Sequence, residues 1–223
     1  MWRAFQLALS DAFAPAGRKA LLLSFGGTLV LLVSLWIGAS ALLALVQVSH
    51  FHWLDTVIDV VGSLATLALA WVLFPTMSML VLGVFLDRFI AVSERMHYPG
   101  LPAARRVGMV EVLRSALWLA VISMVLNLAL LPLYFLPIVN LPIYYGLNGY
   151  LVGRAYFEPI ALRRMDLRTA RHLWNRHSGY LWIAGVFIAV LLSLPLINFV
   201  APLIGVALLF HLFQSLCQDA PAL

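Results

Sequence analysis

The run of apolar residues from Ala20 to Val46, which contains no charged side chain, restricts the fold of this chain more than any other feature. As an α-helix the run would extend about 40 Å, which exceeds the ~30 Å hydrocarbon core of a bilayer. Apolar residues make up 64% of the 223 residues and charged residues only 10%. Soluble domains have about a quarter charged residues. The sequence therefore predicts an integral membrane protein.

The start of the chain also has features of a signal peptide. Arg3, Arg18 and Lys19 precede the apolar run, and Ala39-Ser40-Ala41 resembles a cleavage site. The apolar core of a signal peptide has about 7–15 residues, whereas this run is longer and continues past that site. We therefore interpret 19–46 as an uncleaved first membrane helix.

The rest of the chain is predicted to form one all-α membrane domain, 1–223, with two long transmembrane helices and two helical hairpins. Its other parts are an interfacial helix at 3–16, a long second helix at 57–94 with a kink near Pro75, a first hairpin at 109–158, a linker at 159–179 and a second hairpin at 180–216. Lys and Arg gather at the N-terminus, at 95–108 and in the linker. The positive-inside rule places these parts and both termini in the cytoplasm.

The pattern Leu-Pro-x-x-Asn occurs twice, at 136–140 and at 194–198. We expect the proline to end one helix and the asparagine to cap the next. A second proline then falls in the first turn of the new helix, where a missing N–H costs little. The residues of these turns are Pro137, Asn140 and Pro142 in the first copy, and Pro195, Asn198 and Pro202 in the second.

The lengths of the helices on either side of each turn indicate how deep in the bilayer the turn lies. Residues 180–194 would form a helix of about 22 Å, shorter than the ~30 Å core, so the second hairpin is predicted to enter the bilayer only partly. The depth of the first hairpin stays open. Helix N-termini at membrane depth can hold an anion, but the same pattern also suits a simple tight turn.

Several polar residues lie in apolar surroundings. Arg154 and Glu158 have the i,i+4 spacing of an ion pair, which we interpret as a structural pair near the membrane interface. Asn127 and Asn148 are expected to form hydrogen bonds between helices. Gly149 and Gly153 are expected to let two helices approach closely, within the chain or between subunits.

The residues that usually mark enzymes and metal sites are missing from the sequence pattern. The histidines show no metal-ligand spacing apart from His50-x-His52, which is weak on its own. There is no Gly-rich phosphate loop, no nucleophile elbow and no pair of catalytic carboxylates. The sequence therefore predicts no enzyme, no cofactor and no bound metal, and its charge pattern suits a membrane rather than a nucleic acid.

Four stretches resemble the etoposide-induced protein 2.4 family, which includes the CysZ-type sulfate transporters. In chain order they are LALSDAFAPAGRKALLL, FPTMSMLVLGVFLDRFIAVSERMHYPG, NGYLVGRAYFEPIALRRMDLRTARHLWNRHSGY and LPLINFVAPLIGVALLFHLF. They follow the family's order over nearly the whole chain. The resemblance implies long membrane helices, partly penetrating hairpins, assembly into oligomers and, in the transporter branch, sulfate uptake.

The resemblance also implies a sulfate site. In the transporter branch a basic pair follows Pro-Gly near the first membrane helix, and here Arg18 and Lys19 follow Pro15-Ala16-Gly17. Lysine lacks the bidentate fork of arginine. The branch also has a Gly-Leu-Asn-like element after a proline in the second helix, where this chain has Pro75-Thr76-Met77-Ser78. Both departures bear on the specificity for sulfate.

Two functions fit these patterns. The first is an anion permease of the bacterial inner membrane, most simply for sulfate uptake, with Arg18, Lys19, Asn140 and Asn198 as the anion-binding residues. The second is a membrane scaffold of the same family that does not transport. Both would contact the lipid bilayer and assemble as a homo-oligomer.

Overall fold

The computed structural model describes residues 1–44, 62, 88–194 and 197–219, and within these ranges every regular element is a helix. The chain forms two compact units. One consists of Met1–Gly17 with Ile90–Leu223, and the other of Arg18–Phe89. The all-helical class that the sequence predicts is confirmed.

Helix α2 (Pro15–Ala44) contains most of the long apolar run. It begins at a proline, a residue that the first helical position favours. Large apolar side chains such as Leu22 and Val30 are exposed on it, which suits a helix surrounded by hydrocarbon. The helix starts at Pro15, four residues before the predicted start at Lys19. Most of the predicted second helix at 57–94, with Pro75, lies outside the described residues.

Helix α1 (Trp2–Phe13) takes the place of the predicted interfacial helix at 3–16. Its buried face consists of Ala4, Ala8, Asp11 and Ala12, and it packs against helix α8 (Ala201–Asp219). The small alanine side chains allow the two helices to lie close together. The amino group of Met1 also donates a hydrogen bond to the hydroxyl of Tyr180, at 2.6 Å. Helix α1 is thus attached to the protein on one face.

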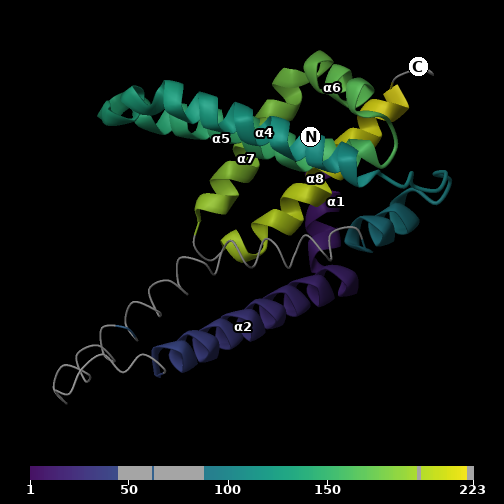
Figure 1. The fold of residues 1–223 in the computed structure, drawn as a ribbon. Helices are drawn as coiled ribbons and strands as arrows, with labels where there is room; N and C mark the ends of the chain where they lie inside the picture. The colour runs from purple at the N-terminus through teal and green to yellow at the C-terminus, as the bar shows by residue number, and fades with distance from the viewer. Residues whose placement is uncertain (45–61, 63–87, 195–196, 220–223) are drawn as a thin grey trace, which may run out of the picture. The chain divides into compact units, whose positions relative to one another are not determined.

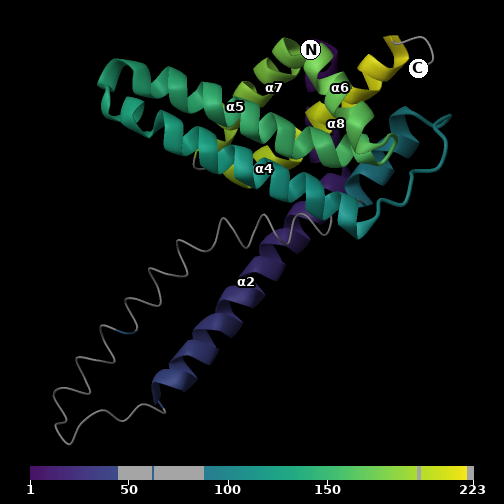
Figure 2. The same cartoon turned by 45° about the horizontal axis from the view of Figure 1, so that its top comes forward.

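The first hairpin consists of α4 (Met109–Leu130), the short 3-10 helix η1 (Leu131–Phe135) and α5 (Pro137–Leu162). In both Figure 1 and Figure 2 the helices α4 and α5 lie side by side. The apolar side chains of α4 are mostly exposed, whereas the second half of α5 is largely buried.

The chain then forms α6 (Leu167–Arg176), α7 (Ser178–Ser193), the 3-10 helix η2 (Ile197–Phe199) and α8. The predicted linker at 159–179 is therefore mainly helical. Asp166 caps the start of α6, because its carboxylate accepts a hydrogen bond from the backbone N–H of Arg168 at 3.2 Å. The bend between α6 and α7 is 90°.

Helices α5 and α7 pack against each other, and glycines lie where the two helices come closest. A Cβ atom at Gly149 would lie 2.8 Å from the backbone nitrogen of Val186, and one at Gly185 would lie 2.9 Å from the Cα of Gly153. Real side chains do not fit at such distances. The close helix packing predicted for Gly149 and Gly153 is confirmed, and it occurs within the chain.

Among the described residues, three helical stretches are long and apolar enough to cross a membrane: Gly17–Gly38, Met109–Phe135 and Ala201–Gln218. The bent pair α6 and α7 would add a fourth if it counts as one span. In the most apolar part of Ala201–Gln218, 83% of the residues are buried, against 0% for Met109–Phe135. Helix α8 therefore lies inside the protein, whereas α4 presents its apolar side chains to the surroundings. The depth of either hairpin stays a prediction.

Candidate functional site

The basic pair Arg18 and Lys19 follows a tight junction between α1 and α2. A Cβ atom at Gly17 would lie 2.7 Å from the carbonyl carbon of Ala12. Only glycine therefore allows the start of α2 to lie so close to the end of α1. Both basic residues are exposed in the first turns of α2. The N-terminus of a helix is already positive, so two cations there concentrate positive charge instead of compensating the helix dipole.

Asn140 does not cap α5 as the sequence predicts. Helix α5 begins at Pro137, and its N-cap residue is Leu136, whose side chain cannot accept a hydrogen bond. The backbone N–H of Asn140 already donates to the carbonyl of Leu136 at 3.0 Å, so Asn140 lies within the first helical turn. Pro142 lies inside the helix. Proline favours the first helical position, so Pro137 starts the helix and the asparagine is displaced inward.

The second turn differs from the first. Asn198 lies in η2, and its backbone N–H donates to the carbonyl of Leu194 at 2.8 Å. Helix α8 begins only at Ala201, so Asn198 does not immediately precede it. Pro202 lies in the first turn of α8, as the sequence predicts. Pro195 lies outside the described residues.

The ion pair predicted between Arg154 and Glu158 is present, with Nε and Oε1 2.6 Å apart. The pair is buried, with 6% of Arg154 and 1% of Glu158 exposed. Its surroundings come from other helices. Ser115 of α4 donates to Oε2 of Glu158, and Nε of Arg171 of α6 lies 3.8 Å from Oε1. Tyr150 accepts a hydrogen bond from Arg154 at 2.6 Å. The pair therefore joins α4, α5 and α6.

The two asparagines predicted to bond between helices bond within their own. The side-chain amide of Asn127 donates to the carbonyl of Ser123, and that of Asn148 to the carbonyl of Tyr144, each at 2.8 Å. The carbonyl four residues back is always within reach of such a side chain, so a partner on another helix is not required.

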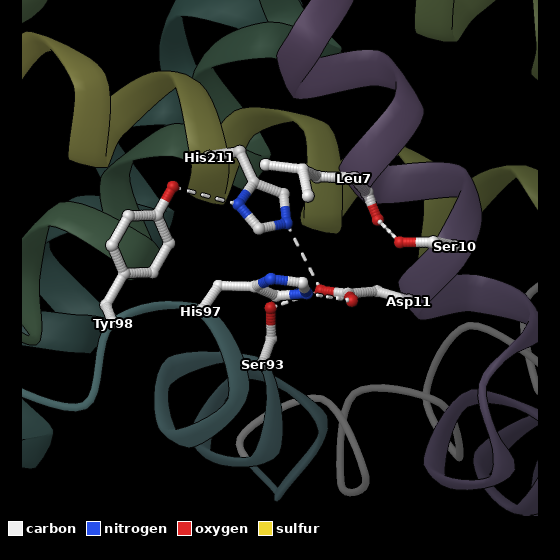
Figure 3. A network of polar contacts seen from close by, with 7 residues as sticks. All are labelled: Leu7, Ser10, Asp11, Ser93, His97, Tyr98 and His211. Atoms are coloured by element: carbon white, nitrogen blue, oxygen red, sulfur yellow. Dashed lines mark hydrogen bonds and ion pairs between the residues drawn. The ribbon is translucent and has the colours of Figure 1, made fainter.

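A further group of polar residues, which we call the aspartate–histidine cluster, consists of Asp11, Ser93, His97, Tyr98 and His211 (Figure 3). It joins α1, the helical segment 88–97, the residue after that segment and α8. Figure 3 shows the two imidazoles and the Ser93 hydroxyl directed at one carboxylate.

The geometry of this cluster is set by Asp11. Nε2 of His97 lies 2.7 Å from Oδ1, and Nε2 of His211 lies 3.1 Å from Oδ2. Burial favours the neutral acid, but the hydrogen bonds with His211, Ser93 and His97 outweigh burial, so the pKa of Asp11 is lowered. Asp11 is therefore a carboxylate. Asp11, His97 and His211 are the residue types and the arrangement that could hold a metal ion.

Sequence spacing did not indicate this cluster, because its members come from distant segments. The sequence nevertheless contains weaker indications that some of these residues have polar partners. Ser93 and His97 are four residues apart and so share a helix face. Asp11 is the only acidic residue of 3–16, and His211 is the only ionisable residue of 199–216. An ionisable residue in an apolar segment is expected to have a partner or a function.

The apolar helices, with their exposed apolar surfaces, define a multi-pass integral membrane protein. The family model described as sulfate transporter CysZ/etoposide-induced protein 2.4 matches residues 1–202, and the chain belongs to this family. The comparison with curated proteins and the comparison with solved structures gave no match.

Proposed function

We propose that the protein is an anion permease of the bacterial inner membrane that takes up sulfate into the cytoplasm, with both termini on the cytoplasmic side. The family match over residues 1–202 carries this proposal. The exposed basic pair at the start of α2 supports it, because Arg18 and Lys19 add two charges to the positive end of a long apolar helix. A doubly charged anion is attracted to such a position.

We also propose that Asn140 and Asn198 help to bind the anion, although neither of them caps a helix as the sequence predicts. The first turn of a helix has backbone N–H groups without partners in the helix. Asn140 lies in the first turn of α5, and Asn198 shortly precedes α8. Their amides would add donors to these helix starts. Exposed apolar side chains near the start of α5, such as Phe135 and Ile138, suit a position within the membrane.

The second candidate function is a scaffold that assembles in the membrane without transport. The exposed apolar surface of α4 favours it, since that surface suits contact with another copy of the chain as well as with lipid. Homo-oligomers are part of both proposals. Uptake of sulfate distinguishes the two, because only the permease moves it.

The proposed permease is tested by uptake of radiolabelled sulfate into proteoliposomes that contain the purified protein. We expect uptake well above that of empty vesicles. Changing Arg18 and Lys19 together to alanine is expected to lower the uptake rate about tenfold or more, since hydrogen bonds to charged groups contribute about 1.5–3 kcal/mol each. Uptake equal to that of empty vesicles, by protein shown to be folded, would contradict the permease.

The matched control removes two charges elsewhere. Arg168 and Arg176 are exposed on α6, and their joint change to alanine lowers the net charge by the same amount. This variant is expected to transport as the unchanged protein does. If both double variants lose the same fraction of uptake, net charge rather than the basic pair controls the rate. Lys19→Arg is expected to keep or increase uptake, because arginine can bind the anion with two parallel hydrogen bonds.

A further inference from the structure

The aspartate–histidine cluster has the composition of a metal site. Its two imidazoles both present Nε2 to the carboxylate of Asp11 (Figure 3). The potential ligand atoms of Asp11, His97 and His211 lie within 4.8 Å of one another. Atoms that bind one ion must come this close. The three residues are separated widely in sequence, so the folded chain alone brings them together.

The donor set selects a class of ion. Two imidazole nitrogens and one carboxylate oxygen suit divalent transition metals, and zinc sites with two histidines and one acidic residue leave a fourth position for water or another oxygen. Ser93 places a hydroxyl next to Asp11 on the same carboxylate. Calcium and magnesium prefer oxygen ligands throughout, so two histidines disfavour them.

The residues around the potential ligands suit a metal site as well. Metal-binding histidines usually have the other ring nitrogen hydrogen-bonded, which orients the ring. The hydroxyl of Tyr98 lies 3.1 Å from Nδ1 of His211. A phenol oxygen can accept the proton that Nδ1 carries when Nε2 binds a metal. Tyr98 would therefore act as a positioning residue.

Burial and access are also favourable. Asp11 and His211 are buried, with 1% and 2% of their surfaces exposed, so few water molecules compete for them. The side chain of His97 is 26% exposed and gives an ion a route to the site.

We propose that Asp11, His97 and His211 bind one divalent transition-metal ion, Zn²⁺ by ligand preference, and that this ion joins α1 and the segment 88–97 to α8. The ion would hold the end of α1, against which Gly17 packs. Arg18 and Lys19 follow Gly17 directly, so the metal would fix the point from which the basic pair begins. This site is independent of whether the protein transports sulfate.

The test uses the full-length protein in detergent, purified with an affinity tag that contains no histidine and treated with a chelator. Titration with Zn²⁺, followed by elemental analysis after gel filtration, is expected to give about one ion per chain. Co²⁺ in the same titration is expected to give visible absorption bands of a metal with nitrogen and oxygen ligands. Less than a stoichiometric amount of retained Zn²⁺ and no Co²⁺ bands would overturn the proposal and leave a hydrogen-bonded network without metal.

The variants assign the ligands. His97→Ala removes a partly exposed ligand and is expected to weaken binding by more than about 100-fold, since loss of an outer partner alone costs about 10–100-fold. His172→Ala, at an exposed histidine of α6, is the matched control and is expected to bind as before. Equal affinity of the His97 variant and the control would overturn the assignment.

Tyr98→Phe tests the site without removing a ligand. It is expected to fold and to bind Zn²⁺ about tenfold more weakly, because the histidine ring loses its partner. Zn²⁺ is also expected to raise the unfolding temperature of the unchanged protein, since an ion that binds only the folded state stabilises it. An equal rise in the His97→Ala protein would contradict binding at this cluster. These measurements need no transport activity, so their failure and that of the permease are separate results.

Discussion

Changing Glu158 to alanine is expected to destabilise the protein by about 3–5 kcal/mol, the usual cost of removing one partner of a buried ion pair. Its carboxylate accepts from Ser115 and pairs with Arg154 at 2.6 Å. The variant would leave the Arg154 guanidinium buried without its counter-charge. Thermal unfolding in detergent, followed by tryptophan fluorescence, measures the loss as a lower unfolding temperature.

The control for this variant is an exposed pair. Arg105 pairs with Glu111, and its side chain is 38% exposed, so Arg105→Ala is expected to cost only about 0–1 kcal/mol. Replacing both Arg154 and Glu158 with methionine removes the charge and its partner together, and is expected to be less harmful than Glu158→Ala. If the double variant is the least stable of the three, the buried pair itself, and not the isolated charge, is what the fold requires.

Changing Gly185 to alanine is expected to destabilise the contact between α5 and α7 by about 1–3 kcal/mol or more. The added methyl group would overlap the backbone oxygen of Gly149 and lie 2.9 Å from the Cα of Gly153. Backbone atoms cannot rotate away as a side chain can, so the helices must separate. The same unfolding measurement, together with the yield of monodisperse protein, reports the effect.

Gly179 provides a matched control on the same helix. A Cβ atom there would have no heavy atom within 4 Å. Gly179→Ala is therefore expected to leave the stability unchanged or to raise it by about 0.4–1 kcal/mol, because alanine reduces the freedom of the unfolded chain. A Gly185→Ala protein that is as stable as this control would show that α5 and α7 are not held at the distance described.

Patterns within one segment were predicted reliably from the sequence. The apolar runs predicted long apolar helices, and among the described residues the stretches Gly17–Gly38, Met109–Phe135 and Ala201–Gln218 are helical and long and apolar enough to cross a membrane. Of the two predicted transmembrane helices, the one at 19–46 corresponds to the first of these stretches, and most of the one at 57–94 lies outside the described residues. The i,i+4 spacing of Arg154 and Glu158 indicated a pair, which is present. Such features depend on the geometry of a single helix, and that geometry follows from the local sequence.

The turns were predicted less well. Asparagine is often the residue that caps the start of a helix, but in neither turn does it occupy the capping position. At Pro137 the proline itself starts the helix, which moves Asn140 inside α5. A short 3-10 helix precedes α8 and contains Asn198. Helix ends depend on small differences in energy between neighbouring residues, so a pattern of five letters cannot decide which residue begins the helix.

The sequence by itself determined that this chain is an all-helical membrane protein, because hydrocarbon offers no hydrogen-bond partner to the backbone and a long apolar run satisfies its own backbone groups as a helix. It also determined the family. Only the tertiary structure decided that α8 is enclosed by protein although it is as long as a membrane span, and that Asp11, His97 and His211 meet. These features arise from contacts between segments far apart in the chain. Such contacts depend on how whole helices pack, which local spacing does not record.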